Sequence, residues 1–414
     1  MVNICDKHNC CGCSACVQSC PQHCIAMQED EEGFLYPQIQ VDQCCDCGLC
    51  EKVCPVLNQE RPYDSLEVYA AKNNDEDELM QSSSGGIFIL LAKQVLCEGG
   101  VVFGVKFDEN WDAIHAYTET EEGVKQFMGS KYVQSRIGNT YQEAKEFLMK
   151  GRQVLYSGTP CQIAGLKRYL RKDYDNLLTV DIICHGVPSP KVWRRYLEEI
   201  KQNALQGENS VSLHPTYNVS DKDSRHENIE IKGISFRDKS IGWKKYCFTL
   251  TLAEVSTDGK QNSVSLSHPF YEDSYMKLFL RNLILRPSCY QCPTRIGKSR
   301  SDMTIADFWG IEKILPEHDD TRGVGLLMLN SDKGRNIINK FDLSLQKVSV
   351  FEGVMKNPSY YSSVTEPVIR SKCFQLLNKK NLCLSKVIEV IDYIPLHIRF
   401  KNKLNSVLKK FIHK

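Results

Sequence analysis

The stretch of sequence that decides the fold is CCGCSACVQSCP, residues 10–21, which is repeated as CCDCGLCEKVCP at residues 44–55. Both copies have the pattern C-x2-C-x2-C-x3-C-P. The two-residue gaps let three thiolates surround one corner of an iron–sulfur cubane, while the fourth cysteine, just before a proline, reaches the partner cubane. The repeat therefore predicts two [4Fe–4S] clusters whose ligand sets cross over.

The register of the repeat assigns the ligands. Zinc also binds thiolates, but it is typical of C-x2-C pairs that lack a close third and fourth cysteine. The spacing is instead that of bacterial two-cluster ferredoxins, so we expect an α+β ferredoxin domain over residues 1–58, with a hairpin at residues 25–39. The expected ligands are Cys10, Cys13, Cys16 and Cys54 for one cluster, and Cys44, Cys47, Cys50 and Cys20 for the other.

The composition favours metal binding over disulfides. Of the 20 cysteines, 12 fall in the first 54 residues, where a signal peptide would be apolar. No apolar run approaches the roughly 18 residues that span a bilayer, so we expect a cytoplasmic protein, in a compartment where disulfides are rare. The formal charge is only +1, so nucleic acid is not an expected partner. Cys5, Cys11, Cys24 and Cys45 lie outside the register and are assigned no role.

The middle of the chain alternates strand and helix patterns. Short apolar runs at 153–157 and 177–184 predict strands, and helical patterns follow them at 161–170 and 191–200. The order strand, helix, strand, helix is typical of a parallel buried sheet. We expect such a sheet in this part of the chain.

Four cysteines of this region are candidates for a third metal site. Cys161 and Cys184 follow the two predicted strands, at the sheet edge where open α/β folds bind ligands. Cys289 and Cys292 form a C-x2-C pair, and together the four thiols could ligate a third [4Fe–4S] cluster. The alternative is that Cys161 and Cys184 are small buried hydrophobes and the pair binds nothing.

Three further segments have patterns that do not decide a function. Two of them allow two structural interpretations each, and one predicts only a surface loop. Residues 82–86, SSSGG, open a helical pattern and could form an anion nest, although an ordinary serine-capped helix has the same sequence. Residues 202–228 are polar and predict a surface excursion. The tail from Arg399 holds six Lys or Arg and no acid, which permits a membrane-surface helix or a packed terminal helix.

As a set, several short motifs resemble the beta subunits of coenzyme F420 hydrogenase and dehydrogenase, in the branch with an N-terminal two-cluster ferredoxin. The resemblance runs from about Cys10 to about Gly334. Besides the cysteine repeat, it rests on Ser83-Ser-Gly-Gly86, Gly129-Ser-Lys-Tyr-Val-Gln134, Gly158-Thr-Pro-Cys-Gln162, Cys184-His-Gly-Val-Pro-Ser189, Phe236-Arg-Asp-Lys239, Cys289-Tyr-Gln-Cys292 and Ile305-Ala-Asp-Phe-Trp-Gly310.

The resemblance implies a mixed α/β domain that binds FAD without the dinucleotide glycine fingerprint. It also implies an iron–sulfur cluster beside the flavin, which favours the third-cluster interpretation of the four later cysteines. Lys131 is expected to place positive charge near the isoalloxazine or pyrophosphate and to favour the anionic reduced flavin. Amide or hydroxyl contacts to FAD are expected from Ser84, Gly85, Gly86, Thr159 and Gly186.

The expected organisation has four parts. The first part is the ferredoxin domain. Two parts of the beta-subunit-like domain follow, of which the second carries the flavin and iron–sulfur chemistry. The last part is a helical basic tail. Their predicted bounds are 1–58, 66–145, 146–340 and 341–414.

The main functional hypothesis is an iron–sulfur flavoprotein oxidoreductase without an assigned catalytic residue. It would pass electrons between one-electron clusters and a two-electron donor or acceptor, because FAD handles both. Its partner would be a redox protein or a small-molecule two-electron carrier. The alternatives are a non-enzymatic electron-transfer subunit or docking partner of a larger complex, and a peripheral membrane protein serving polysaccharide assembly through its basic tail.

Overall fold

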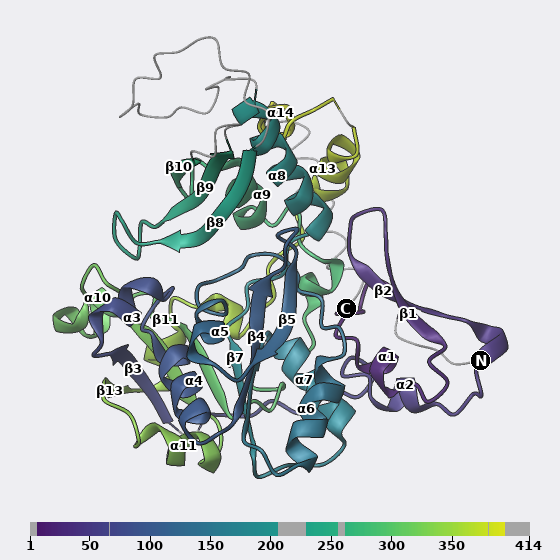
Figure 1. Ribbon diagram of the computed structural model, residues 1–414, viewed down its shortest axis with the longest axis vertical. Coiled ribbons are helices and arrows are strands. Elements are labelled where there is room, and N and C mark those ends of the chain that lie inside the picture. Colours follow the sequence, from purple (N-terminus) through teal and green to yellow (C-terminus); the bar gives the residue numbers. More distant parts are fainter. Residues whose placement is uncertain (1–5, 66, 206–228, 256–260, 380, 394–414) are drawn as a thin grey trace, which may run out of the picture. The chain divides into compact units, whose positions relative to one another are not determined.

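The computed structural model describes residues 6–65, 67–205, 229–255, 261–379 and 381–393 (Figure 1). These residues form two compact units, each assembled from several stretches of the chain. The first unit takes the described residues up to Pro190, with Arg237–Tyr246 and Arg286–Val364. The second unit takes the described residues within Lys191–Phe236, Cys247–Leu285 and from Thr365 onward.

The cysteine repeat in the first unit is built around a hairpin. Strands β1 (Ile25–Glu29) and β2 (Leu35–Ile39) pair antiparallel, with Ile25 opposite Ile39. The Asp30 carboxylate closes their turn, since it accepts from the backbone N–H of Phe34 at 2.8 Å. Short helices α1 (Ala15–Ser19) and α2 (Leu49–Lys52) belong to the two copies of the repeat, and turn η1 spans Val41–Gln43. The hairpin expected at residues 25–39 is confirmed.

An eight-stranded mixed sheet forms the rest of the first unit, in the order β13-β3-β12-β11-β7-β6-β4-β5. Its central strands β4, β6, β7 and β11 run parallel, and the outer pairs are antiparallel. The strands are β3 (Glu67–Asn73), β4 (Val101–Phe107), β5 (Ala113–Thr118), β6 (Val154–Gly158), β7 (Leu177–Ile182), β11 (Met303–Asp307), β12 (Gly325–Leu329) and β13 (Leu343–Val348).

The predicted strand and helix succession is confirmed at the centre of this sheet. Strand β6 pairs in parallel with β7, with Val154 opposite Leu177, and helix α7 (Pro160–Leu170) connects them. The Thr159 hydroxyl and the Gln162 side chain form a capping box that starts α7. The remaining helices of the unit are α3 (Glu76–Gln81), α4 (Ile87–Cys97), α5 (Glu121–Lys125), α6 (Thr140–Met149), α10 (Ile311–Ile314), α11 (Asp332–Ile338) and α12 (Val350–Val354), with turns η2 (Pro287–Gln291), η3 (Pro316–His318) and η4 (Pro358–Tyr360).

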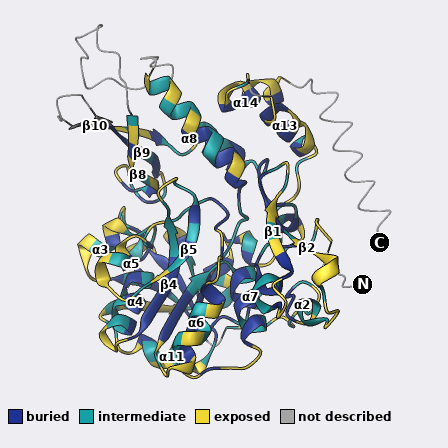
Figure 2. Cartoon of the chain, turned by 45° about the vertical axis from the view of Figure 1, so that its right-hand side comes forward, coloured by how far each residue is buried: buried dark blue, intermediate teal, exposed yellow. Residues whose placement is uncertain are grey.

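Successive residues of the central strands face two separate cores. In β6, Val154 and Tyr156 pack on one face of the sheet and Leu155 on the other, as the two-residue period of a strand requires. Figure 2 shows β4 buried along much of its length, which explains why the parallel strands are apolar. Ala15 and Val53 from the cysteine repeat join the core of Val154 and Tyr156. The repeat is therefore packed into the same core as α6 and α7.

The second unit contains the three-stranded sheet β10-β9-β8, in which β10 and β9 pair antiparallel. An aromatic group that includes Trp193, Tyr196 and Tyr275 packs inside it, and the Tyr196 hydroxyl donates to the Asp273 carboxylate at 2.5 Å. Most of the polar excursion and the basic tail from Arg399 lie outside the described residues. The elements are α8 (Pro190–Leu205), β8 (Ile229–Asp238), β9 (Cys247–Val255), β10 (Gln261–Pro269), α9 (Ser274–Leu280), α13 (Arg370–Leu377) and α14 (Leu384–Asp392).

Candidate functional site

The first copy of the repeat encloses a hollow lined by cysteines. Cys10, Cys13 and Cys16 from this copy meet Cys54 from the second copy. All four side chains are buried, and Met27 and Pro37 of the hairpin close the hollow. The structure thus brings together the four side chains expected to bind one cluster.

The second copy encloses an equivalent hollow. Cys44, Cys47 and Cys50 line it together with Cys20 from the first copy. Here Cys47 is exposed and Cys44 half-buried, so two thiols of this set are more exposed to solvent than those of the first set, which are all buried. The crossed grouping expected from the sequence is present in the geometry.

Left-handed backbone shapes both hollows. Gly12 (φ +70°) and Ser14 (φ +60°) in the first copy correspond in the repeat to Asp46 (φ +54°) and Gly48 (φ +66°) in the second. These turns point successive thiols to the same side, which extended or helical backbone would not do. The spacing and this backbone together define the two thiol groups.

The chemistry of the first hollow suits a positively charged metal cluster. Burial, together with negative charge on Cys10 and Cys54, raises the pKa of the Cys16 thiol to about 12. Four thiolates in this space repel one another unless cations lie between them, and metal ions supply that charge while deprotonating the thiols. The donor set therefore fits an iron–sulfur cluster.

Arg286 fastens the first hollow to the sheet domain. This fully buried guanidinium donates to the Cys10 carbonyl at 2.7 Å and to the Leu35 carbonyl at 3.0 Å. It also donates to the Gln134 side chain at 3.0 Å and stacks on Tyr36 at 4.1 Å. The sequence prediction did not include Arg286, because its partners lie more than 100 residues away.

The four later cysteines form a third group at the carboxyl edge of the sheet. Cys161 lies in the first turn of α7, and Cys184 follows β7. Cys289 accepts a hydrogen bond from the backbone N–H of Val187, with N and Sγ 3.4 Å apart. The third group is therefore assembled from three stretches, as the sequence predicted from the strand ends.

The thiols of the third group are close enough to raise one another's pKa. Burial raises the pKa of Cys184 well above its usual range, and charge on Cys289, Cys161 and Cys292 raises it further. Burial also raises the pKa of Cys289 to about 12. Arg295 opposes these effects at Cys184. Like that of the first hollow, this donor set would be stabilised by a cation between its thiolates.

Cys11, which the sequence left without a role, lies between the first hollow and the third group. It lines the first hollow, and its thiol is within hydrogen-bonding reach of Cys13 on one side and Cys161 on the other. The contact with Cys13 and burial raise the pKa of Cys11. Two cysteine groups that are far apart in the sequence are therefore neighbours in space.

The loops of Ser84 and Lys131, both expected at the flavin, lie next to each other. The hydroxyls of Ser83 and Ser130 are 2.9 Å apart, and the Ser130 backbone N–H donates to Ser83. Lys131 Nζ donates to the carbonyls of Met128 at 2.9 Å and Gly129 at 3.2 Å. Burial lowers the pKa of Lys131 to about 7. A nearby anion would compensate this buried amine.

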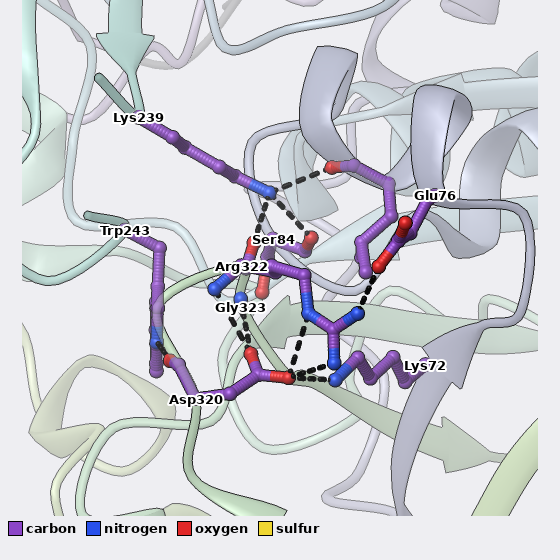
Figure 3. A network of polar contacts seen from close by, with 9 residues as sticks. Lys72, Glu76, Ser84, Lys239, Trp243, Asp320, Arg322 and Gly323 are labelled. Atoms are coloured by element: carbon purple, nitrogen blue, oxygen red, sulfur yellow. Dashed lines mark hydrogen bonds and ion pairs between the residues drawn. The ribbon is translucent and has the colours of Figure 1, made fainter. Parts of the chain in front are cut away.

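Lys239 holds the Ser84 loop from the other side (Figure 3). Its Nζ donates to the carbonyls of Ser84, Leu79 and Arg322, at 2.6 to 2.9 Å. Gly85 must be a glycine here, since an added Cβ would lie 2.3 Å from the Ala71 carbonyl. Gly86 has φ +73° and starts α4. The backbone therefore requires glycine at both positions, whether or not either residue touches a flavin.

Arg237, a further residue without a role in the sequence prediction, faces the same region. Its Nη1 donates to Asp307 at 2.7 Å and to the Tyr132 hydroxyl at 3.3 Å, and it stacks on Tyr246 at 4.1 Å. Its Nε is buried and has no hydrogen-bond partner among the described residues. A buried unpaired donor is costly, so this atom fits an acceptor from a bound group. The motif Phe236-Arg-Asp-Lys239 was the available sequence signal.

Thr159 and Gly186 lie beside the third cysteine group instead. The Thr159 hydroxyl is 3.2 Å from Cys161 Sγ, and Gly186 precedes the Val187 amide that bonds Cys289. No contact among the described residues links either of them to Ser84 or Lys131. The six expected flavin contacts therefore fall into two sets.

Comparison with known proteins identifies both parts of the chain. Residues 151–347 match the family described as the C terminus of the coenzyme F420 hydrogenase/dehydrogenase beta subunit, and residues 9–58 match the 4Fe-4S dicluster domain. A chain from the F420-reducing NiFe hydrogenase complex of Methanosarcina barkeri is similar at 15% identity and a TM-score of 0.43, over 72% of this chain and 88% of that chain. No curated protein matches.

The fold and the cysteine groups define an iron–sulfur protein of mixed α/β architecture with an N-terminal ferredoxin-like domain. Residues 151–347 form the C-terminal domain of the coenzyme F420 hydrogenase/dehydrogenase beta-subunit family, and a 4Fe-4S dicluster domain precedes it at residues 9–58. This family and domain support electron transfer of the oxidoreductase type. Within the described residues, no helix is both long and apolar enough to cross a membrane.

Proposed function

We propose that this protein is a flavin- and iron–sulfur-dependent oxidoreductase. It passes electrons between ferredoxin-type clusters and a two-electron donor or acceptor through FAD. The contact of Cys11 with Cys161 carries the proposal, because it makes the first hollow and the third cysteine group neighbours. Electron transfer between such centres requires proximity, which the sequence alone did not establish for them.

The three cysteine groups are the proposed cluster ligands. The crossed sets of the repeat hold two [4Fe–4S] clusters, and Cys161, Cys184, Cys289 and Cys292 hold a third. The crossover supports transfer between the first two clusters, because Cys20 and Cys54 each lie in one copy and face the other hollow. The amide of Val187 and the hydroxyls of Thr159 and Thr294 would tune the third cluster by bonding its sulfur ligands.

The flavin is proposed to lie against the loops of Ser84 and Lys131. Ser84, Gly85 and Gly86 would offer backbone amide donors at the start of α4, where the helix dipole favours an anion. Lys131 would supply positive charge to the pyrophosphate or the reduced ring, and Arg237 Nε would donate to an acceptor atom. Thr159 and Gly186 would contact the flavin where it faces the third group.

The residues around this site have distinct tasks. FAD, when bound, exchanges two electrons with a hydride partner and single electrons with clusters. Asp307 holds the Arg237 guanidinium, and Lys239 holds the Ser84 loop, so both donors are positioned before a ligand arrives. The proposed partner that exchanges electrons with the site is a redox protein or a small-molecule two-electron carrier.

Iron and FAD content of the anaerobically purified full chain tests this proposal. About twelve iron atoms and one FAD per chain are expected, since each cubane holds four irons. About eight irons with FAD would withdraw the third cluster. About eight irons without FAD after reconstitution would favour a non-enzymatic electron carrier over an oxidoreductase.

Matched variants assign the third cluster. Cys184→Ala should lower the iron content by about four atoms and leave the two clusters of the repeat in place. Cys247→Ala is the control, because Cys247 is buried but lies in β9 of the other unit. Equal iron in both variants would show that Cys184 is not a ligand.

Lys131 has its own test. Lys131→Met should reduce FAD retention or lower the flavin potential, since it removes the cation while keeping an unbranched side chain. Lys125→Met, at an exposed position in α5, is the control. Unchanged FAD content and potential in the Lys131 variant would remove this residue from the flavin site.

A further inference from the structure

A cleft of about 620 Å³ in the first unit is lined by none of the six expected flavin contacts and none of the cysteines. Its walls come from the end of the cysteine repeat at Lys52 and Pro55, the outer side of α7, and the loop at residues 293–300. This volume is in the range of small-molecule sites.

The cleft is strongly basic, although the whole chain is nearly neutral. Seven Lys or Arg side chains and only two carboxylates, Glu60 and Asp173, line it. The chain has 52 basic and 51 acidic residues, so this local excess is far from its average. Cations gathered in a concave site with low-dielectric walls focus their field on an anion.

Most of these cations lack an acidic partner. Glu60 pairs with Arg168 at 2.5 Å and with Arg300 at 3.8 Å. Among the described residues, no carboxylate lies within 4.0 Å of the charged groups of the other five, and burial lowers the pKa of Lys167. These five are Lys52, Lys167, Arg171, Lys172 and Lys298.

The backbone of the cleft is held in an unusual shape. Ile296 (φ +56°) and Arg300 (φ +59°) in the loop, and Arg171 (φ +59°) at the end of α7, are left-handed residues that are not glycine. Such backbone is costly, especially for a β-branched isoleucine, and is concentrated at functional sites. Tyr63 fixes the loop, because its N–H donates to the Ile296 carbonyl at 3.1 Å. The basic side chains are therefore placed on rigid supports.

We propose that this cleft binds a small polyanion that carries at least two phosphate or carboxylate groups. The five cations without a carboxylate partner supply several separate contacts, and the volume suits a small molecule better than a macromolecular surface, which is typically flatter. The cleft borders two cysteine groups: Pro55 follows Cys54, and Thr294, in its wall, has its hydroxyl 3.4 Å from Cys292 Sγ. This inference goes beyond the proposed electron transfer and does not depend on it.

Titration calorimetry of the full chain at low ionic strength tests the cleft, with inorganic pyrophosphate and citrate as probes. Saturable binding of at least one probe is expected, and preference between the two distinguishes phosphate from carboxylate ligands. The variant Lys167→Gln/Arg171→Gln/Lys298→Gln should weaken binding at least tenfold. The control Lys125→Gln/Lys150→Gln/Lys313→Gln removes the same charge from exposed positions outside the cleft and should change binding less than twofold.

The outcomes separate the cleft from the redox chemistry. Iron and FAD content of both triple variants should equal that of the wild type, which shows that folding and cofactors are intact. No saturable binding of either probe, or equal weakening in both triple variants, would overturn the proposal. Binding only of an acidic protein, measured with a ferredoxin as the probe, would also overturn it.

Discussion

The two copies of the cysteine repeat have the same spacing and the same left-handed positions, but their surroundings differ. All four cysteines of the first set are buried, whereas in the second set only Cys20 and Cys50 are buried, Cys44 is half-buried and Cys47 is exposed. The local sequence therefore sets how thiols are grouped, and tertiary packing sets how far each group is shielded. Because hydrogen bonding and solvent exposure tune cluster potentials, the two halves should behave as different redox sites.

The largest expected difference is in iron loss. A strong iron chelator should first remove about four irons, from the second hollow with its exposed Cys47, and remove the rest more slowly. A time course of iron release measures this. Cys47→Ala should abolish the fast phase and Cys13→Ala the slow one. A single phase in the wild type would contradict the contrast between the hollows.

Removing Arg286 should weaken the first half selectively. Arg286→Ala leaves the carbonyls of Cys10 and Leu35 and the Gln134 side chain without their donor, and should lower the free energy of unfolding by about 3–5 kcal/mol. Urea unfolding measures the change. Arg136→Ala, at an exposed ion pair with Asp108, should cost less than about 1 kcal/mol. Similar costs would show that Arg286 is not the anchor.

Two glycines, one from each copy of the repeat, compare how tightly the two copies are packed. Gly48→Ala should lower the free energy of unfolding by about 1–2 kcal/mol, since its φ of +66° is left-handed but its surroundings are open. Gly12→Ala should cost about 1–3 kcal/mol more, because its Cβ would lie 2.9 Å from Arg286 Nη1 and Gln134 Nε2. Thermal unfolding of both variants gives the ranking, and the reverse order would place the tighter packing around the second copy.

The smallest effect concerns the two cysteines outside the register. Cys11→Ala should lower the free energy of unfolding by about 1 kcal/mol, because it opens a small cavity between Cys13 and Cys161. Cys45→Ala, at the equivalent exposed position, should stay within about 0.5 kcal/mol of the wild type. Urea unfolding compares the two, and a larger loss at Cys45 would contradict the burial contrast.

The sequence anticipated features whose cause is local. The hairpin between the two copies, the crossed cysteine sets and the succession from β6 through α7 to β7 all follow from spacing and period over a few residues. The third cysteine group could also be proposed, because strand ends in a parallel sheet meet at one edge. The four predicted domain bounds stay predictions.

Other features depended on contacts between distant stretches. Nothing in the sequence near β3 indicates that it lies between β12 and β13, and the third strand of the small sheet, β10, was not expected. Arg237 and Lys239 were part of a quoted motif, yet only their contacts with Asp307 and the Ser84 loop indicate a task.

By itself, therefore, the sequence determined which thiols group together, because spacing and left-handed turns gather three thiols within each copy and the repeat supplies the fourth from the other copy. Only the tertiary structure decided that the first group is shielded by Arg286 and that Cys11 brings it next to Cys161. The basic cleft is likewise a tertiary feature, since its cations come from three separate stretches. Burial and electrostatic fields are sums over neighbours in space, and the fold alone selects those neighbours.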